Sequence, residues 1–225
     1  LEIDTSAPGF PDTPTIGAIT DDVGADQGPL NDGDSTDDTT PTLSGGGLAL
    51  GDTVDIYDGG ELIGTADVLA DGTWSFTPPT PLNDGDHVLT IIAQDPAGNR
   101  SDESAPWTII VDTTPPDVPT LDSVYDDQGT IQDFLAPGDV TDDATPTLRG
   151  TGEANGQVVI YDFGVEIGRA DVQSDGTWVF EPSLPLANGP HELTVKAVDT
   201  VGNLSAASDP FDFTLLAGGA PAAPA

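Results

Sequence analysis

The chain contains no cysteine and no methionine, and only four of its 225 residues are Lys or Arg. The lack of cysteine excludes disulfides, thiolate catalysis and Cys-ligated zinc. No run of residues approaches the roughly 18 apolar residues of a membrane-spanning helix, and no signal peptide stands at the start. We therefore expect no direct membrane insertion, and the signal of an exported protein would lie outside this sequence.

The scarcity of basic residues leaves a formal net charge of −36, because 40 residues are Asp or Glu. Binding to nucleic acid rests on Lys and Arg, and so does binding to anionic membrane surfaces. The sequence therefore argues against both as partners. Repulsion among so many carboxylates destabilises a compact chain, so we expect positive charge from outside the chain to offset it.

The acidic residues are mostly of one kind, since 33 of the 40 are Asp. Asp favours turns and holds its carboxylate close to the backbone, whereas a solvated helical surface favours Glu. Carboxylates carried on loops suit calcium, which prefers oxygen ligands. The alternative is an acidic surface that keeps the protein of a salt-adapted or marine organism soluble, but it does not explain why the Asp residues cluster.

One sequence unit of roughly 105 residues is written twice, as internal repeats of a tandem array are. Trp74 recurs as Trp178, 104 positions later, whereas Leu43 recurs as Leu148, 105 positions later. One residue is therefore gained or lost between these motifs, and we place the change near residues 52–56. We divide the chain into repeat 1 (1–111), repeat 2 (112–216, with a linker at 112–116) and an Ala/Gly/Pro tail (217–225).

Short β-branched segments bounded by Gly, Pro, Asn and Asp are typical of an all-β sandwich. In repeat 2 we predict strands near residues 120–125, 146–150, 158–162, 166–172, 176–181, 191–198 and 211–215. Alternation within the sixth segment places Leu193, Val195 and Ala197 inside. We therefore predict an all-β fold of two tandem immunoglobulin-like β-sandwich domains of about seven strands each, with Trp74 and Trp178 in the cores.

Acidic residues cluster in the loop that joins the first two predicted strands of each repeat. The strand directions place this loop at the C-terminal end of its domain. Carboxylates this dense repel one another unless they are protonated or bridged by a cation, and calcium takes about six to eight oxygen ligands. The predicted loop ligands are Asp21, Asp22, Asp37 and Asp38 in repeat 1, and Asp126, Asp127, Asp142 and Asp143 in repeat 2.

A second group of candidate ligands lies where one repeat meets the next. The linker begins with an Asp, and a matching Asp stands before repeat 1. The loop between the last two strands of each repeat carries the pattern Asp-x-x-Gly-Asn and would lie beside the linker that enters its domain. The predicted junction ligands are Asp4 with Asp95 and Asn99, and Asp112 with Asp199 and Asn203.

The unit carries six motifs in a fixed order across residues 4–216: Asp-Thr-Thr-x-Pro, Thr-Asp-Asp-x-Thr-Pro-Thr-Leu, Ile-Tyr-Asp, Asp-Gly-Thr-Trp, Asn-Gly-x-His and Asp-x-x-Gly-Asn. The first and the fifth are complete in repeat 2 only, and the other four stand in both copies. This set resembles the bacterial Ig-like repeats of giant secreted adhesins, namely RTX adhesins and biofilm adhesins of the BapA and SiiE kind. The resemblance implies a long tandem array at the cell surface, type I secretion, and several Ca²⁺ ions at domain junctions and in the acidic loops. One departure is that no Asp-Thr-x-x-Pro follows Leu216.

We expect a structural extender, or stalk, that calcium stiffens and that projects a distal adhesive region for cell adhesion and biofilm formation. Its partners would be neighbouring repeats of the same monomeric chain, with any host or matrix ligand bound through other domains. The alternative is a calcium-dependent module, of the same adhesin or of a secreted enzyme, that binds glycan or protein through Tyr57, Tyr161 or Trp107. We expect no enzymatic activity, because no nucleophile motif stands beside His87 or His191.

Overall fold

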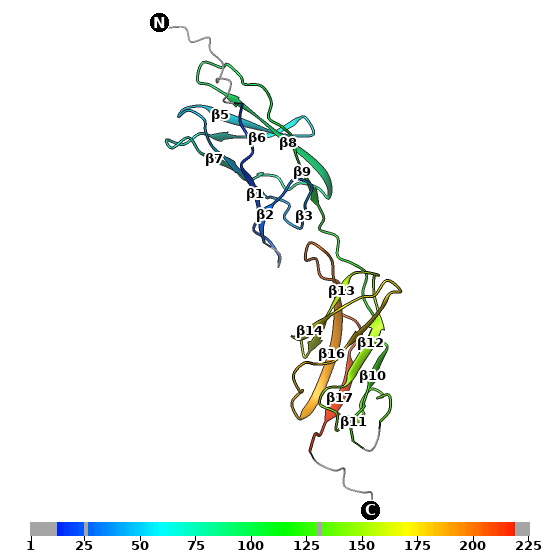
Figure 1. Ribbon diagram of the computed structural model, residues 1–225. Coiled ribbons are helices and arrows are strands. Elements are labelled where there is room, and N and C mark those ends of the chain that lie inside the picture. The colour runs from blue at the N-terminus through cyan, green and yellow to red at the C-terminus, as the bar shows by residue number, and fades with distance from the viewer. Residues whose placement is uncertain (1–12, 25–26, 130–131, 219–225) are drawn as a thin grey trace, which may run out of the picture. The chain divides into compact units, whose positions relative to one another are not determined.

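A computed structural model describes residues 13–24, 27–129 and 132–218. The chain divides into two compact units, Leu1–Thr114 and Pro115–Ala225, so the division falls within the linker at 112–116 (Figure 1). The described residues form strands, turns and loops, and none of them lies in a helix that could cross a membrane. The predicted all-β fold of two immunoglobulin-like sandwiches is confirmed.

The described part of unit 1 has nine strands in two sheets. They are β1 (Ala18–Asp21), β2 (Gly28–Leu30), β3 (Ser35–Thr36), β4 (Thr42–Gly45), β5 (Thr53–Asp58), β6 (Glu61–Asp67), β7 (Trp74–Phe76), β8 (Gly85–Gln94) and β9 (Trp107–Val111). One sheet has the order β2-β1-β4-β7, and the other has the order β3-β9-β8-β5-β6. The pairing of β3 with β9 is parallel.

The described part of unit 2 repeats this plan with eight strands. They are β10 (Ser123–Tyr125), β11 (Val140–Thr141), β12 (Thr147–Thr151), β13 (Gln157–Asp162), β14 (Val165–Asp171), β15 (Thr177–Phe180), β16 (Gly189–Val198) and β17 (Phe211–Leu215). The sheet orders are β10-β12-β15 and β11-β17-β16-β13-β14, with β11 parallel to β17.

Sequence patterns located the long strands and missed the shortest ones. Each of the seven strands predicted for repeat 2 is present, with ends shifted by a few residues at most. The prediction lacked β11, and the corresponding acidic loop of unit 1 also contains β2 and β3. Strands of two or three residues are too short to show alternation, so only their pairing reveals them.

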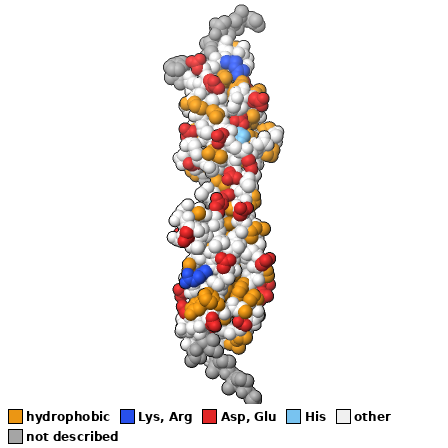
Figure 2. Space-filling model, turned by 90° about the vertical axis from the view of Figure 1, so that its right-hand side faces the viewer, with side chains coloured by type: hydrophobic (Ala, Val, Ile, Leu, Met, Phe, Trp, Pro, Cys, Tyr) orange, Lys and Arg blue, Asp and Glu red, His pale blue; other side chains and the backbone are white. Residues whose placement is uncertain are grey.

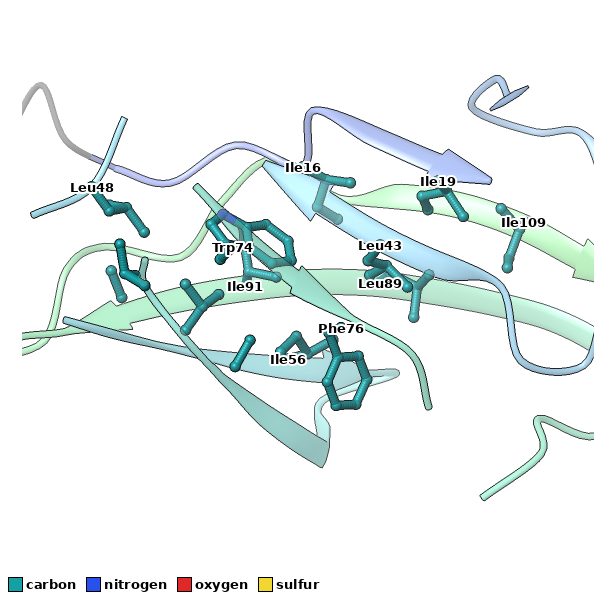
Figure 3. Close-up of a cluster of buried hydrophobic side chains, with 14 of the residues drawn as sticks. Ile16, Ile19, Leu43, Leu48, Ile56, Trp74, Phe76, Leu89, Ile91 and Ile109 are labelled. Atoms are coloured by element: carbon teal, nitrogen blue, oxygen red, sulfur yellow. The ribbon is translucent and has the colours of Figure 1, made fainter. Parts of the chain in front are cut away.

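The cores contain the residues that alternation placed inside. Leu193, Val195 and Ala197 of β16 are all buried. Trp178 is fully buried, and Trp74 is 2% exposed. Figure 3 shows Trp74 reaching from β7 into a cluster of aliphatic side chains from both sheets of unit 1. The prediction that both tryptophans fill the cores is confirmed.

The extra residue that makes repeat 1 longer than repeat 2 lies earlier in the chain than predicted. Gly45 and Gly150 hold equivalent places opposite the core tryptophans, 105 positions apart. Leu48 and Gly152 make the same backbone hydrogen bond to the glycine that precedes each Thr-Trp pair, but they are 104 positions apart. The extra residue of repeat 1 therefore belongs to residues 46–47, in a loop, where a change of length disturbs no strand pairing.

The two units differ on the outer face of β5 and of the matching strand β13. In unit 1 the guanidinium of Arg100 lies 3.0 Å from the carboxylate of Asp55 and donates to the Tyr57 hydroxyl at 2.6 Å. In unit 2 the equivalent positions hold Val159 and Leu204, and Val159 is fully buried. An ion pair in one repeat thus corresponds to two apolar residues in the other.

Arg100→Leu should lower the free energy of unfolding of unit 1 by about 1–3 kcal/mol, because it leaves the carboxylate of Asp55 buried without a cation. Adding Asp55→Val to this variant should recover most of the loss, since the pair then matches repeat 2. Urea unfolding of the wild type, both single variants and the double variant measures the coupling. A double variant as unstable as Arg100→Leu would contradict this interpretation.

Candidate metal centres in the acidic loops

Two Asp side chains of the acidic loop of unit 1 are buried on either side of a threonine. Asp21, at the end of β1, is 3% exposed, and Asp38, just after β3, is 1% exposed. The Thr36 hydroxyl donates to Asp21 Oδ2 at 2.6 Å and accepts the backbone N–H of Asp38 at 3.0 Å. Pairing of β3 with β9 holds Thr36 in place, so the sheet itself positions both carboxylates.

The other hydrogen bonds to this pair also come from neutral groups. Asp21 Oδ1 accepts from the backbone N–H of Val23 at 2.9 Å, and Asp38 Oδ1 accepts from that of Thr40 at 2.7 Å. The N–H of Asp22 approaches Asp38 Oδ2 at 3.4 Å. In the described part of unit 1, the ion pairs of His and Arg lie elsewhere. Two buried carboxylates thus share one site without a basic side chain.

Unit 2 contains the same network. Asp126 is 5% exposed and Asp143 is fully buried. The Thr141 hydroxyl donates to Asp126 Oδ2 at 2.6 Å and accepts the N–H of Asp143 at 3.0 Å. The N–H of Asp127 donates to Asp143 Oδ2 at 3.2 Å. Because both repeats preserve these contacts, the arrangement is a property of the Thr-Asp-Asp motif in this fold.

A third carboxylate of each loop packs against a glycine. The space that a Cβ would need at Gly24 is filled by the carboxylate of Asp37, and Asp142 fills the space at Gly129. These glycines have φ angles of 67° and 68°, which L residues with side chains adopt only at a cost. In each loop the glycine backbone therefore packs directly against this third carboxylate. The structure thus brings together the predicted loop ligands of each repeat, although Asp22 and Asp127 contribute backbone groups and expose their side chains.

The oxygen atoms of these networks are chemically suitable ligands for a hard cation. Every side chain in these networks presents oxygen, the ligand type that calcium prefers. A carboxylate has about four lone-pair positions, so Asp21, which accepts two hydrogen bonds, retains acceptor capacity. Within residues 13–24, 27–129 and 132–218, however, no three His, Asp or Glu side chains converge as ligands of one ion. The carboxylates point instead toward N–H groups and hydroxyls.

The predicted junction residues of the Asp-x-x-Gly-Asn loops interact with each other. Asp95 Oδ1 accepts the backbone N–H of Asn99 at 2.7 Å, and Asp95 Oδ2 accepts the Asn99 amide at 2.7 Å. Asp199 and Asn203 repeat these contacts, both at 2.9 Å. In both units the Asp carboxylate therefore closes its own loop.

The remaining junction ligands are the Asp residues of the linker segments. The backbone N–H of Asp112 donates to the Thr36 carbonyl at 2.9 Å, so the linker starts beside the acidic loop of unit 1. Its carboxylate accepts the N–H of Thr114 at 3.0 Å. Asp4 lies outside the described residues.

Sequence reasoning missed a His–Asp contact at the same end of each unit. The His87 ring in β8 lies between Asp58 Oδ2, 2.6 Å from Nδ1, and the Asn83 carbonyl, 2.8 Å from Nε2. His191 is placed in the same way, 2.7 Å from both Asp162 and the carbonyl of residue 187. The signal was present, because an Asp that ends one strand and a His that begins another recur at the same offset.

His87 faces an acceptor at each ring nitrogen, so both nitrogens donate only in the imidazolium form. Burial of the ring opposes protonation, but the hydrogen bonds to Asn83 and Asp58 and the charge of Asp58 outweigh it. The pKa of His87 is therefore raised above its ordinary value.

The aromatic residues considered for ligand binding are engaged within their own units. Trp107 packs against the core of unit 1 and pairs with Leu89, in the register that Phe211 shows in unit 2. Tyr57 accepts a hydrogen bond from an Arg, and the ammonium group of a Lys lies 5.7 Å from the ring centre of Tyr161. These contacts favour a structural role for all three.

A family model and several solved structures match this chain. A family model described as the bacterial Ig-like domain matches residues 13–113 and 119–215. Similar solved structures include the fibronectin(III)-like modules of Clostridium thermocellum CbhA, with 20% identity, a TM-score of 0.48, and coverage of 88% of this chain and 93% of that one. Another is the BSP domain of a biofilm-associated protein, with 22% identity, a TM-score of 0.30, and coverage of 85% and 30%. No curated protein sequence matches.

The stability that His87 contributes should depend on pH. A raised pKa in the folded state stabilises the protein fully below the ordinary His value of about 6.5, and this contribution disappears as the pH rises through the folded-state pKa. We expect His87→Gln to lower the free energy of unfolding by about 1–2 kcal/mol near pH 6 and by much less near pH 9. Urea unfolding at both pH values measures this, and Asp58→Asn should weaken the pH dependence, since the hydrogen bond from the ring to the Asn83 carbonyl remains. Equal losses at the two pH values would contradict the ionic contact.

Proposed function

Since this chain belongs to the bacterial Ig-like domain family and carries two copies of the domain, we propose that it is a stalk segment of a secreted bacterial surface adhesin. In this role the units act as rigid spacers, and Ca²⁺ bound in the acidic loops and at the joint stabilises and stiffens them. Adhesion to a host or matrix ligand then belongs to other domains. The partners of each unit are its neighbours along the same chain.

One observation carries the calcium proposal, namely the pair of carboxylates buried in each acidic loop. Asp21 and Asp38 are at most 3% exposed, and Asp126 and Asp143 are at most 5% exposed. Burying a charge without a partner of opposite sign is strongly unfavourable, and two adjacent carboxylates also repel each other. A bound cation removes both penalties. Because both units contain the same network, we propose one such cation in each unit.

The charge of the whole chain favours the same conclusion. Acidic side chains are spread over the face of the molecule in Figure 2, whereas basic ones occur at few places on it. With a net charge of −36, cation binding relieves repulsion throughout each unit. The loops offer carboxylates, hydroxyls and carbonyls, which suit calcium better than magnesium, whose octahedral geometry is stricter.

The calcium affinity expected of such sites indicates where the protein acts. Extracellular calcium modules bind at about 10⁻⁴ to 10⁻³ M, so they are filled outside the cell and empty in the cytosol. A chain of this kind folds more stably after export, which fits a location at the cell surface. We propose a mechanical rather than catalytic role, because the repeated carboxylates are enclosed in loops and hydrogen-bonded to neighbouring backbone groups.

Calcium should raise the melting temperature. Ten millimolar calcium at a dissociation constant of about 10⁻⁴ to 10⁻³ M stabilises each site by about 1.4–2.7 kcal/mol, which corresponds to a rise of roughly 5–15 °C for a domain of this size. Calorimetry in calcium and in EDTA measures the shift. Identical melting curves in the two buffers, or an equal rise with magnesium, would overturn the proposal.

Matched variants locate the effect within each unit. Asp38→Asn with Asp143→Asn should abolish most of the calcium-dependent shift, since each removes a buried carboxylate. Asp71→Asn with Asp175→Asn changes the net charge equally, but these exposed carboxylates bind only the neighbouring threonines, so the shift should persist. Loss of the shift in both double variants would mean that calcium acts through overall charge alone.

Stiffening of the joint is a separate prediction. Chelation should broaden the distance distribution from small-angle scattering, because a joint without calcium samples more arrangements of the two units. Asp112→Ala in calcium should broaden it in the same way while both units keep their melting behaviour. A distribution unchanged by EDTA would confine the role of calcium to stability within the units.

A further inference from the structure

The chain leaves unit 1 through residues that lie outside its strands but are held by its side chains and backbone. The N–H of Asp112 donates to Thr36, as described above. The N–H and the hydroxyl of Thr113 both donate to Asp84 Oδ1, at 3.1 and 2.7 Å. The hydroxyl of Thr114 reaches Asp84 Oδ2 at 3.1 Å, and its N–H donates to Asp112. Every backbone donor of this three-residue segment is therefore bound within unit 1.

Asp84 can hold this segment because its own loop is fixed at two points. The preceding Leu82 is 8% exposed, and its N–H donates to the Thr39 carbonyl at 2.8 Å. The Asn83 carbonyl accepts the His87 ring at 2.8 Å. The loop that carries Asp84 is thus tied to the acidic loop at one point and to β8 at the other.

Unit 2 has the same device with different chemistry. Asn188 Oδ1 accepts the N–H of Ala217 at 2.7 Å, and the Asn188 amide donates to the Ala217 carbonyl at 3.1 Å. The supporting contacts recur: the N–H of Leu186 donates to the Ala144 carbonyl at 2.8 Å, and the His191 ring contacts the carbonyl of residue 187. Residues 84 and 188 are 104 positions apart, as are 113 and 217.

The side chain in each unit matches the residue that it holds. Thr113 presents two donors, its N–H and its hydroxyl, and a carboxylate offers acceptors only. Ala217 presents its backbone N–H as a donor and its carbonyl as an acceptor, and a side-chain amide offers both an acceptor oxygen and N–H donors. The change from Asp84 to Asn188 thus accompanies the change from Thr to Ala. Such a matched change is expected if holding the exit segment is what the position does.

We propose that residues 84 and 188 are exit clamps, which fix the direction in which the chain leaves each unit and require no bound ion. The clamp makes Asp112, Thr113 and Thr114 an extension of unit 1. The joint between the units then begins at Pro115, where two consecutive prolines restrict φ. This inference goes beyond the calcium-dependent stalk, because the clamp contributes rigidity that chelation cannot remove.

The clamp can be tested in EDTA by NMR relaxation and amide exchange on the whole chain. In Asp84→Ala the order parameters of the Thr113 and Thr114 amides should fall from about 0.85 toward 0.6 or below. Exchange of the Thr113 amide should accelerate by about tenfold, the scale set by one hydrogen bond of ordinary net strength. Asp71→Ala is the matched control, since Asp71 accepts the same two donors from Thr73, at 3.1 and 2.6 Å. It should mobilise residue 73 and leave residue 113 unchanged.

Rescue by exchanging the two chemistries tests the clamp more strictly. Asp84→Asn together with Thr113→Ala recreates the pair of unit 2 and should restore order at residue 113. Asn188→Asp should mobilise Ala217, because a carboxylate cannot donate to its carbonyl, and adding Ala217→Thr should reverse the effect.

The outcomes separate the clamp from the calcium proposal. Thr113 and Thr114 amides as ordered in Asp84→Ala as in the wild type, or a failed rescue by the exchanged pair, would overturn the clamp. A melting temperature insensitive to calcium would leave these measurements unaffected, because they are made in EDTA. Loss of order throughout unit 1 in Asp84→Ala would also overturn it, since the residue would then support the fold rather than the exit.

Discussion

The arrangement on which each unit depends is a threonine placed between two buried carboxylates. Thr36 and Thr141 occupy strands of only two residues, and these strands add to the second sheet in parallel to the last strand of the unit. The hydroxyl bridge ties that strand to the end of the first strand in the opposite sheet. A loop that would otherwise repel itself is thereby given a fixed path, at the cost of burying negative charge.

The same short strand connects the acidic loop to the exit of the unit. In unit 1 the carbonyl of Thr36 accepts the N–H of Asp112, and in unit 2 the carbonyl of Thr141 accepts that of Leu216. These threonines contact both the buried carboxylates and the exit segment. A change at the carboxylates would therefore act on the exit segment through a single threonine in each unit. Calcium in the loops and the side-chain clamp at residues 84 and 188 would in this way act on the same few residues from two sides.

A comparison of the two repeats shows which contacts use the same residues in both units and which use different ones. The Asp-Thr-Asp network is the same in both units. The ion pair of Asp55 with Arg100 is replaced by apolar residues, and the clamp changes from carboxylate to amide together with its partner. Packing and hydrogen-bond pairing at these two places are satisfied by different residue combinations, whereas the Asp-Thr-Asp network uses the same residues in both units.

Alternation and motif order were enough to predict the repeat, the long strands and the inward residues. They also placed Asp21 and Asp38 in one acidic loop, and Asp126 and Asp143 in the other. The sequence did not determine which carboxylates are buried, since burial depends on a two-residue strand that only pairing with a distant strand creates. Nor did it show that Asp95 closes its own loop or that Asp84 holds Thr113, 29 positions away. The contact of Asp84 with Thr113 joins two distant segments that the fold brings together, and the contact of Asp95 with Asn99 depends on the path of the loop between them. Neither follows from motif order, because motif order specifies neither the pairing of distant segments nor the path of a loop.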